Sequence, residues 1–141
     1  MPLTTDHDIR ELLETVRTIA LVGASDNPAR ASNEVMAMLQ GHGYRVIPVN
    51  PRLGGAAIHG EPVRRELAEI EGAIDLVDIF RNSDDAGDTV NEAIAVGAKA
   101  VWMQLGVIND GAALRAELAG LKVVMNRCPK IEIRRLGIAK V

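Results

Sequence analysis

The stretch that decides the fold is Ile19-Ala20-Leu21-Val22-Gly23-Ala24-Ser25, followed after one residue by Asn27-Pro28-Ala29-Arg30-Ala31-Ser32-Asn33. An apolar run of strand length ends in a turn of small residues, and a helix is expected to begin at Ser32 or Asn33. This layout gathers unpaired backbone N–H groups and the positive end of a helix dipole in one place. Such a place suits a phosphate group, so the sequence predicts a nucleotide-like ligand.

Beyond this stretch, apolar strand-like runs alternate with helical patterns. The expected strands cover residues 18–22, 45–49, 76–80, 100–103 and 123–125. Helical spacing predicts helices over residues 6–16, 33–40, 84–96 and 109–118, a short helix over 63–70, and a Gly-rich loop over 51–60. Apolar strands separated by helices are typical of a parallel sheet covered on both faces. The predicted fold class is therefore α/β: a Rossmann-like, doubly wound sheet of about five parallel strands with helices on both faces, forming one domain over residues 1–141.

The composition excludes several classes of protein. Apolar residues make up 48% of the chain and charged residues 25%, which is typical of a globular protein. No apolar run approaches the roughly 18 residues that a membrane span needs. The net charge is −3 and aromatic residues are only 2%, which argues against a nucleic-acid partner. A polar, acidic start and a single cysteine, Cys128, favour a cytoplasmic protein without a signal peptide.

The carboxyl ends of the strands are where a doubly wound sheet binds its ligand. This rule selects residues 23–25, 50–52, 80–82, 104–106 and 126–128. The G-x-G-x-x-G fingerprint of dinucleotide sites is absent, and the second strand ends in Asn50-Pro51-Arg52 without the usual carboxylate for a ribose diol. A cation at this place favours a ligand with an extra phosphate on its ribose. NADP and coenzyme A (CoA) both qualify.

The residues at these strand ends resemble the family of small bacterial CoA-binding proteins. The resemblance covers essentially the whole chain in order, and it extends to the CoA-binding domain of the succinyl-CoA synthetase α subunit and of ADP-forming acyl-CoA synthetases. The matching segments are 22–25 with Pro28, Arg30 and Ser32, then 49–51, 75–81, 100–107 and 124–132.

The resemblance implies a role for each matching residue. Those expected to contact the diphosphate are Gly23, Ala24 and Ser25, with Arg30 and Ser32 at the helix start. Those expected beside the adenosine are Asn50, Pro51 and Arg52, with Arg52 on the 3′-phosphate. Phe80 and Arg81 would flank the adenine or the start of the pantetheine arm, and the arm itself would run along Gln104, Asn126, Arg127 and Cys128.

The chain also departs from the synthetases. They carry Asn-Cys-Pro-Gly where this chain has Asn126-Arg127-Cys128-Pro129-Lys130, so one residue is inserted and a glycine is replaced. Their phosphate-relay histidine belongs to a second domain, and we expect none of His7, His42 and His59 beside the crevice. The ligase reaction therefore does not carry over, and no catalytic residue or metal site is nominated.

The expected function is non-catalytic binding of CoA or an acyl-CoA, as a sensor or carrier. The alternatives are a small NADP-dependent reductase, an acyl-CoA-using transferase, or an interaction module with a degenerate pocket. No nucleic-acid or membrane partner is expected, and both a monomer and a homodimer fit the sequence.

Several other polar residues have structural interpretations. Asp75 is expected to cap a strand entrance, whereas Asp78 lies within the strand and needs a partner if it is buried, with Arg81 or a backbone donor expected. Arg30 has an alternative partner in Glu34 on the following helix. Cys128 is interpreted as a small filler rather than a nucleophile. The tail residues Glu132, Arg134 and Arg135 are expected to be solvated or to face another subunit.

Overall fold

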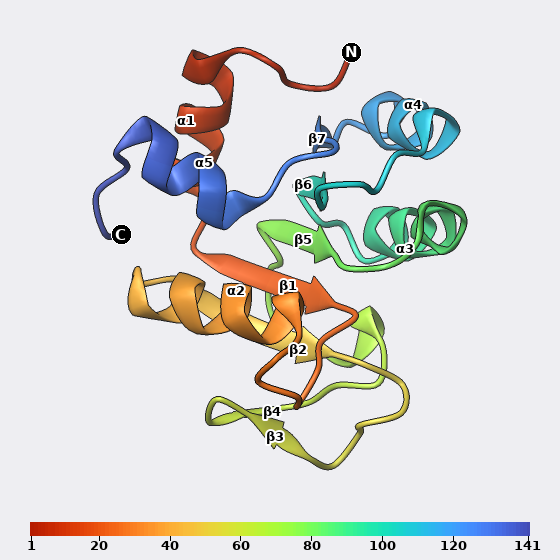
Figure 1. The fold of residues 1–141 in the computed structure, drawn as a ribbon. Helices are drawn as coiled ribbons and strands as arrows, with labels where there is room; N and C mark the ends of the chain where they lie inside the picture. The colour runs from red at the N-terminus through yellow and green to blue at the C-terminus, as the bar shows by residue number, and fades with distance from the viewer.

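The computed structural model describes all residues 1–141 and contains a five-stranded parallel sheet (Figure 1). The strands are β1 (Thr18–Val22), β2 (Arg45–Val49), β5 (Leu76–Ile79), β6 (Ala100–Met103) and β7 (Lys122–Val124), and they lie in the order β2-β1-β5-β6-β7. The predicted fold class is confirmed, and each predicted strand lies within one residue of the observed bounds. The strand order reverses between β1 and β5, which makes that junction the topological switch point of the sheet.

Helices cover both faces of the sheet. One face carries α1 (Asp6–Thr15), α2 (Ala31–Gly41) and α5 (Pro129–Leu136), and the other carries α3 (Ser83–Ala95) and α4 (Asp110–Leu118). Figure 1 shows α1 beside α5 and α3 beside α4 in these two groups. No helix combines the length and the apolar character needed to cross a membrane.

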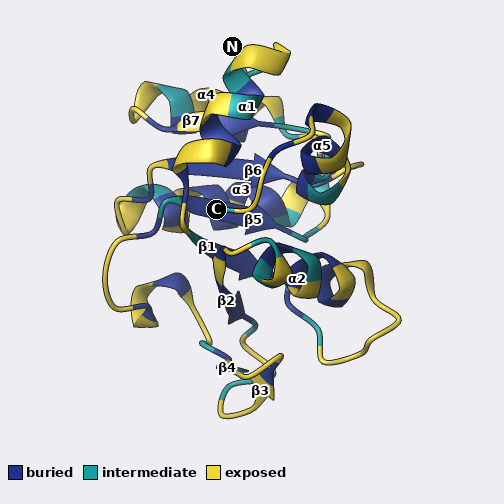
Figure 2. Cartoon of the chain, turned by 90° about the vertical axis from the view of Figure 1, so that its left-hand side faces the viewer, coloured by how far each residue is buried: buried dark blue, intermediate teal, exposed yellow.

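The period-two alternation of the strands divides the core into two halves. Along β1, Ile19 and Leu21 face α1, α2 and α5, whereas Ala20 and Val22 face α3 and α4. Each half holds 21 buried residues. Figure 2 shows the result: beyond their first residues the strands of the five-stranded sheet are buried, and exposed residues lie on the outer faces of the helices and on the loops.

The predicted helix over residues 63–70 is wrong. Only a short 3-10 turn, η1 (Leu67–Glu69), forms there. Arg64 instead pairs in parallel with Val49 at the edge of β2: its N–H donates to the Pro48 carbonyl oxygen, and its carbonyl accepts from Asn50 N–H. These backbone bonds to an open sheet edge hold the segment extended, and the preceding proline supports that conformation.

The predicted loop over residues 51–60 also contains structure. Its end forms a small hairpin of β3 (Ala57–Ile58) and β4 (Glu61–Pro62). The two turn residues, His59 and Gly60, have φ values of 48° and 82°. Positive φ at both central positions is the conformation that two-residue hairpins favour.

The helix α5 was not predicted, because the sequence analysis treated residues after 128 as a tail. Proline stands at its start, and Gly137 ends it in the left-handed conformation with a φ of 63°. Ile133 and Leu136 are buried at helical spacing. A proline at the first position and a glycine just past the end are the usual signals of a short helix, so the information was in the sequence.

Candidate ligand-binding site

The turn after β1 lies at the switch point, against the end of β5. Gly23 has a φ of 89°, and a Cβ atom there would lie 2.1 Å from the carbonyl oxygen of Phe80. Only glycine accommodates both the positive φ and this close approach. The turn therefore packs closely against the end of β5, and its other side lines a hollow.

Two asparagine side chains hold the carbonyl groups of this turn. Asn50 Nδ2 donates to the Ala24 carbonyl oxygen at 2.8 Å, and Asn33 Nδ2 donates to the Ser25 carbonyl oxygen at 2.9 Å. Asn33 is itself buried, with 6% of its surface exposed. The carbonyl oxygens are thus satisfied inside the protein, which leaves the backbone N–H groups as the polar atoms available to a ligand.

Some of the backbone N–H groups that the sequence analysis expected to be unpaired in this turn are already hydrogen-bonded within the protein. Those of Gly23 and Ala24 both donate to the Val49 carbonyl oxygen, at 3.0 and 3.3 Å. Those of Ser25 and of Ala31 and Ser32, the first two residues of α2, have no acceptor within the chain. The available donors therefore come from the end of the turn and from the N-terminus of α2, where the helix dipole adds positive potential.

These donors open into a hollow of about 450 Å³, here called the turn pocket. Two arginines stand beside it, and neither Arg30 nor Arg52 has a carboxylate partner in the chain, so the alternative pairing of Arg30 with Glu34 does not form. The lining residues are Gly23, Ala24, Ser25, Asp26, Arg30, Ala31, Ser32, Asn50, Arg52, Leu53 and Phe80.

Two further hollows continue the turn pocket into a groove along the carboxyl edge of the sheet. One, of about 450 Å³, has two arginines in its lining and no large apolar side chain; it is lined by Gly23, Asn50, Pro51, Arg52 and Arg81. The other, of about 480 Å³, is here called the apolar pocket and is lined by Ala31, Val35, Phe80, Arg81, Asn82, Gln104, Leu105, Val107, Cys128 and Ile131. The apolar pocket shares Ala31 and Phe80 with the turn pocket.

The groove gathers residues from separate strand ends that the sequence analysis placed at one edge. Of the nominated site residues, all except Asn126 and Arg127 line one of the three hollows. Arg81 also lies 3.5 Å from Asp85 on α3, in a half-exposed ion pair. A groove that is cationic and rich in N–H donors at one end and apolar at the other suits a long ligand with phosphates at one end only.

Comparison with known proteins shows that a family model described as "CoA binding domain" matches residues 17–134. The chain belongs to this CoA binding domain family. The match confirms the resemblance seen in the strand-end motifs, and membership supports CoA binding in general. Over 124 residues the chain is 36% identical to YneT, an uncharacterised protein of Bacillus subtilis strain 168, with 88% of this chain and 90% of YneT covered.

Solved structures show the same fold. A hypothetical protein from Pyrococcus horikoshii OT3 is 41% identical, with a TM-score of 0.89 over 96% of each chain. A dinucleotide-forming acetyl-coenzyme A synthetase from Candidatus Korarchaeum cryptofilum matches with a TM-score of 0.73 and 20% identity, over 86% of this chain and 28% of the synthetase. At that identity the likeness concerns the fold alone.

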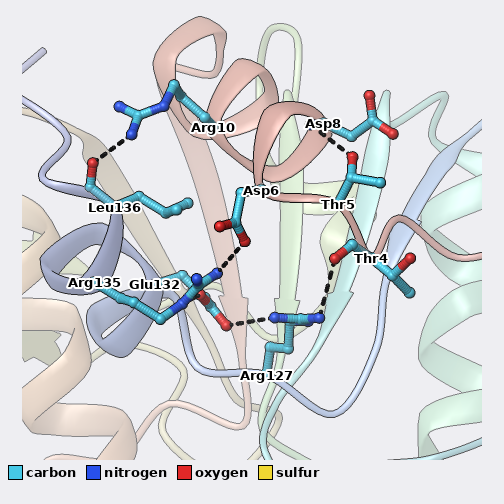
Figure 3. A network of polar contacts seen from close by, with 9 residues as sticks. All are labelled: Thr4, Thr5, Asp6, Asp8, Arg10, Arg127, Glu132, Arg135 and Leu136. Carbon is cyan, nitrogen blue, oxygen red and sulfur yellow. Dashed lines mark hydrogen bonds and ion pairs between the residues drawn. The ribbon is translucent and has the colours of Figure 1, made fainter.

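Arg127, one of the nominated ligand residues, lines none of the three hollows. Arg127 donates to Glu132 Oε1 at 2.9 Å and to the Thr4 carbonyl oxygen at 3.3 Å (Figure 3). Its own carbonyl oxygen accepts from Trp102 Nε1 at 2.7 Å. The preceding Asn126, with a φ of 59°, accepts from Gly106 N–H through its side chain at 2.7 Å. Both residues hold the loop that carries Cys128 rather than lining a hollow.

A buried carboxylate organises this network. Glu132 on α5 is 5% exposed, and its two oxygens accept from Arg127 and from Arg135 Nε at 2.9 and 2.7 Å. Arg135 also donates to Asp6 Oδ1 at 2.8 Å, and this hydrogen bond lowers the pKa of Asp6 (Figure 3). The expectation of a solvated tail is therefore wrong for Glu132, because it is buried and paired with Arg127 in the loop before α5 and with Arg135 on α5 itself.

The buried Asp78 has a partner that the sequence analysis missed. Asp78 is 0% exposed, and its Oδ1 accepts from Gln104 Nε2 at 2.7 Å, not from Arg81. Asp78 pairs in register with Trp102, and Gln104, two residues after Trp102 and just past the end of β6, lies on the same face. Burial raises the pKa of Asp78 to about 7, against the effect of the Gln104 hydrogen bond. Strand adjacency was the signal that could have identified this pair.

The histidines stand apart from the lining of the groove. His59 Nε2 lies 2.8 Å from Asn33 Oδ1, and His42 stacks on Tyr44 with 6.0 Å between ring centroids. His7 lies with Asp8 and Glu11 on the exposed side of α1, where their ligating atoms are within 4.8 Å of one another. The expected cap at Asp75 does form, since its Oδ2 accepts from the backbone N–H groups of residues 17 and 18.

Proposed function

We propose that this chain binds CoA or an acyl-CoA in the groove at the carboxyl edge of the sheet, as a non-catalytic sensor or carrier. The observation that carries the proposal is the pair of unpartnered guanidinium groups, Arg30 and Arg52, beside free backbone N–H donors in one pocket. Cations without a carboxylate partner, next to a helix N-terminus, favour phosphate groups as ligands.

The groove offers a place for each part of the ligand. The N–H groups of Ser25, Ala31 and Ser32 would bind the diphosphate, with Arg30 beside it. Arg52 would bind the 3′-phosphate of the ribose. The pantetheine arm would pass Phe80 and enter the apolar pocket, where an uncharged chain replaces water against apolar walls.

The chemistry of the lining supports a binding role. Apart from arginines, the only titratable side chains on the groove are Asp26 in the turn pocket and Cys128 in the apolar pocket. They lie in different hollows, and neither has a histidine or lysine beside it in the lining to act as a general base. A non-catalytic carrier or sensor needs no such group.

Calorimetric titration of the ligand-free protein with CoA, 3′-dephospho-CoA and NADP tests this proposal. CoA is expected to bind with micromolar affinity, and loss of the 3′-phosphate is expected to weaken binding about tenfold. Arg52→Ala should cause a similar loss for CoA and almost none for 3′-dephospho-CoA. The matched control is Arg45→Ala, because this exposed arginine stands at the opposite, amino end of β2.

The same titration separates the alternatives. Binding of NADP without CoA would contradict the proposal and favour a reductase. Equal effects of Arg52→Ala and Arg45→Ala would contradict the assignment of Arg52 to the ribose phosphate. Absence of binding for all three ligands would leave the groove without the proposed role.

A further inference from the structure

The lining of the apolar pocket includes one buried polar side chain, Gln104, which is hydrogen-bonded to a carboxyl group in the sheet. Gln104 lines the pocket but is 95% buried, and its Nε2 donates to Asp78 Oδ1 at 2.7 Å. In its ionised form, which prevails above about pH 7, the Asp78 carboxylate only accepts hydrogen bonds, so it can pair with the amide N–H of Gln104 but not with the amide oxygen. The hydrogen bond to Asp78 therefore directs the Gln104 amide nitrogen toward the sheet and leaves its oxygen on the opposite side.

The other end of the amide, Gln104 Oε1, has no partner in the chain. No hydrogen bond reaches it, yet it is not among the fully buried atoms that lack a partner, which are His42 Nε2 and Asp78 Oδ2. Gln104 Oε1 thus keeps contact with the space outside the protein core, and the hollow that Gln104 lines is the apolar pocket. Gln104 is the one buried polar side chain of this lining, since the other polar side chains, Arg81 and Asn82, are partly or fully exposed.

We propose that Gln104 Oε1 accepts a hydrogen bond from an amide N–H of the ligand's pantetheine arm, and that Asp78 is the positioning residue that makes this acceptor face the pocket. The inference rests on the proposed function, since it assigns a donor on the arm that enters this pocket. It adds a recognition element for the uncharged part of the ligand, whereas the arginines recognise its phosphates.

The class of donor follows from the cost of covering an acceptor. A ligand that removed water from Gln104 Oε1 without donating to it would leave a buried oxygen unsatisfied, which is unfavourable. A thiol is a weak donor, whereas an amide N–H is a strong one. The pantetheine arm of CoA carries two amide groups, so it can satisfy the acceptor while its methylene groups cover the apolar walls.

The test compares CoA with adenosine 3′,5′-diphosphate, a fragment that has the phosphorylated ribose but no arm. Gln104→Met keeps the size of the side chain and removes the acceptor. It is expected to weaken CoA binding about tenfold and to leave binding of the fragment unchanged. Asp78→Leu should weaken CoA binding in the same selective way, because the amide loses the group that orients it.

Two further variants separate positioning from general damage. Asp78→Asn retains a carbonyl oxygen that can accept from Gln104, so it should restore the CoA affinity that Asp78→Leu loses. In the double variant with Gln104→Met, the change Asp78→Leu should cost no additional affinity, because residues that act through one contact are not additive. Gln104→Met remains informative even if Asp78→Leu does not fold.

Four outcomes would contradict the role proposed for Gln104 or the function on which it rests. A Gln104→Met protein that binds CoA as tightly as the wild type overturns the inference, and so does an equal loss for CoA and the fragment. Desulfo-CoA, which lacks the thiol, should be affected like CoA; if Gln104→Met leaves its binding unchanged, the donor is the thiol and the amide assignment is wrong. A wild-type protein that binds neither CoA nor the fragment overturns the proposed function itself.

Discussion

Asp78 gives a quantitative test of how a buried carboxyl group affects this fold. Its side chain is 0% exposed in the middle of the sheet, and only one of its two oxygens has a hydrogen-bond partner. Burial raises its pKa from 3.8 to about 7, although the bond from Gln104 acts in the opposite direction. The native protein therefore holds this proton over a range of pH in which the unfolded chain has already lost it.

The sign of the effect follows from the proton balance. Between about pH 4 and pH 7 the native state binds more protons at this site, so the free energy of unfolding falls as the pH rises. Above pH 7 both states are ionised and the loss is complete. At about 1.4 kcal/mol for each pKa unit, the shift corresponds to about 2 kcal/mol at pH 5 and about 4 kcal/mol at pH 8.

Asp78→Asn removes the titration and nearly keeps the shape of the side chain. Relative to the wild type, the variant is expected to gain about 2–3 kcal/mol of unfolding free energy between pH 5 and pH 8. Urea unfolding of both proteins at four pH values across this range measures the difference. A difference that stays constant with pH would show that Asp78 titrates like an exposed carboxyl group and would refute the reasoning.

Asp75 supplies a control of opposite sign. Its partial burial raises the pKa, but hydrogen bonds from the backbone N–H groups of Thr18 and Arg17 and from Lys99 outweigh burial and lower it. A lowered pKa contributes stability at neutral pH that is lost as the pH falls through the folded-state value. Asp75→Asn should therefore be destabilised at neutral pH, with the difference from the wild type shrinking in acid.

Three further predictions concern the groove and its support. Gly23→Ala should destabilise the protein by about 2–4 kcal/mol in urea unfolding, because the new Cβ would meet the Phe80 carbonyl, whereas Gly41→Ala, where nothing lies within 4 Å, should be neutral or stabilising. Glu132→Gln should cost about 1–3 kcal/mol in the same assay, since it weakens ion pairs to two partly exposed arginines; an unchanged midpoint would contradict the network. Saturating CoA should slow alkylation of Cys128 by iodoacetamide on the order of tenfold, while adenosine 3′,5′-diphosphate leaves the rate unchanged; equal rates with and without CoA would place the arm elsewhere.

The sequence allowed the fold and the edge of the candidate site to be predicted because both follow from simple periodicities. Apolar runs separated by helical patterns determine a parallel sheet, and parallel strands bring all their carboxyl ends to one edge. Positions far apart in the chain, such as Gly23, Phe80 and Cys128, could therefore be placed along one groove. Whether they contact a ligand stays a prediction.

The features that the sequence did not yield depend on contacts between segments. The extended course of residues 63–66 results from pairing with the open edge of β2, which no local pattern encodes. The partner of Asp78 is Gln104 and not Arg81 because the pairing depends on strand register and on which face each side chain occupies, and Arg81 lies two residues past the end of β5, where it lines the groove. Arg127 was grouped with the ligand residues by its position, but its side chain follows the buried Glu132 instead.

Residues outside the family match, which covers residues 17–134, also hold the helix that forms one wall of the groove. The family match begins at residue 17, whereas α1 lies before it and packs on α5. Asp6 binds Arg135, Arg10 donates to the Leu136 carbonyl oxygen at 2.6 Å, and the Thr4 carbonyl accepts from Arg127 (Figure 3). These contacts fix α5 and the loop before it, which together supply one wall of the apolar pocket. Arg127 adds to this arrangement by joining the segment before α1, through Thr4, to Glu132 on the helix that forms the pocket wall.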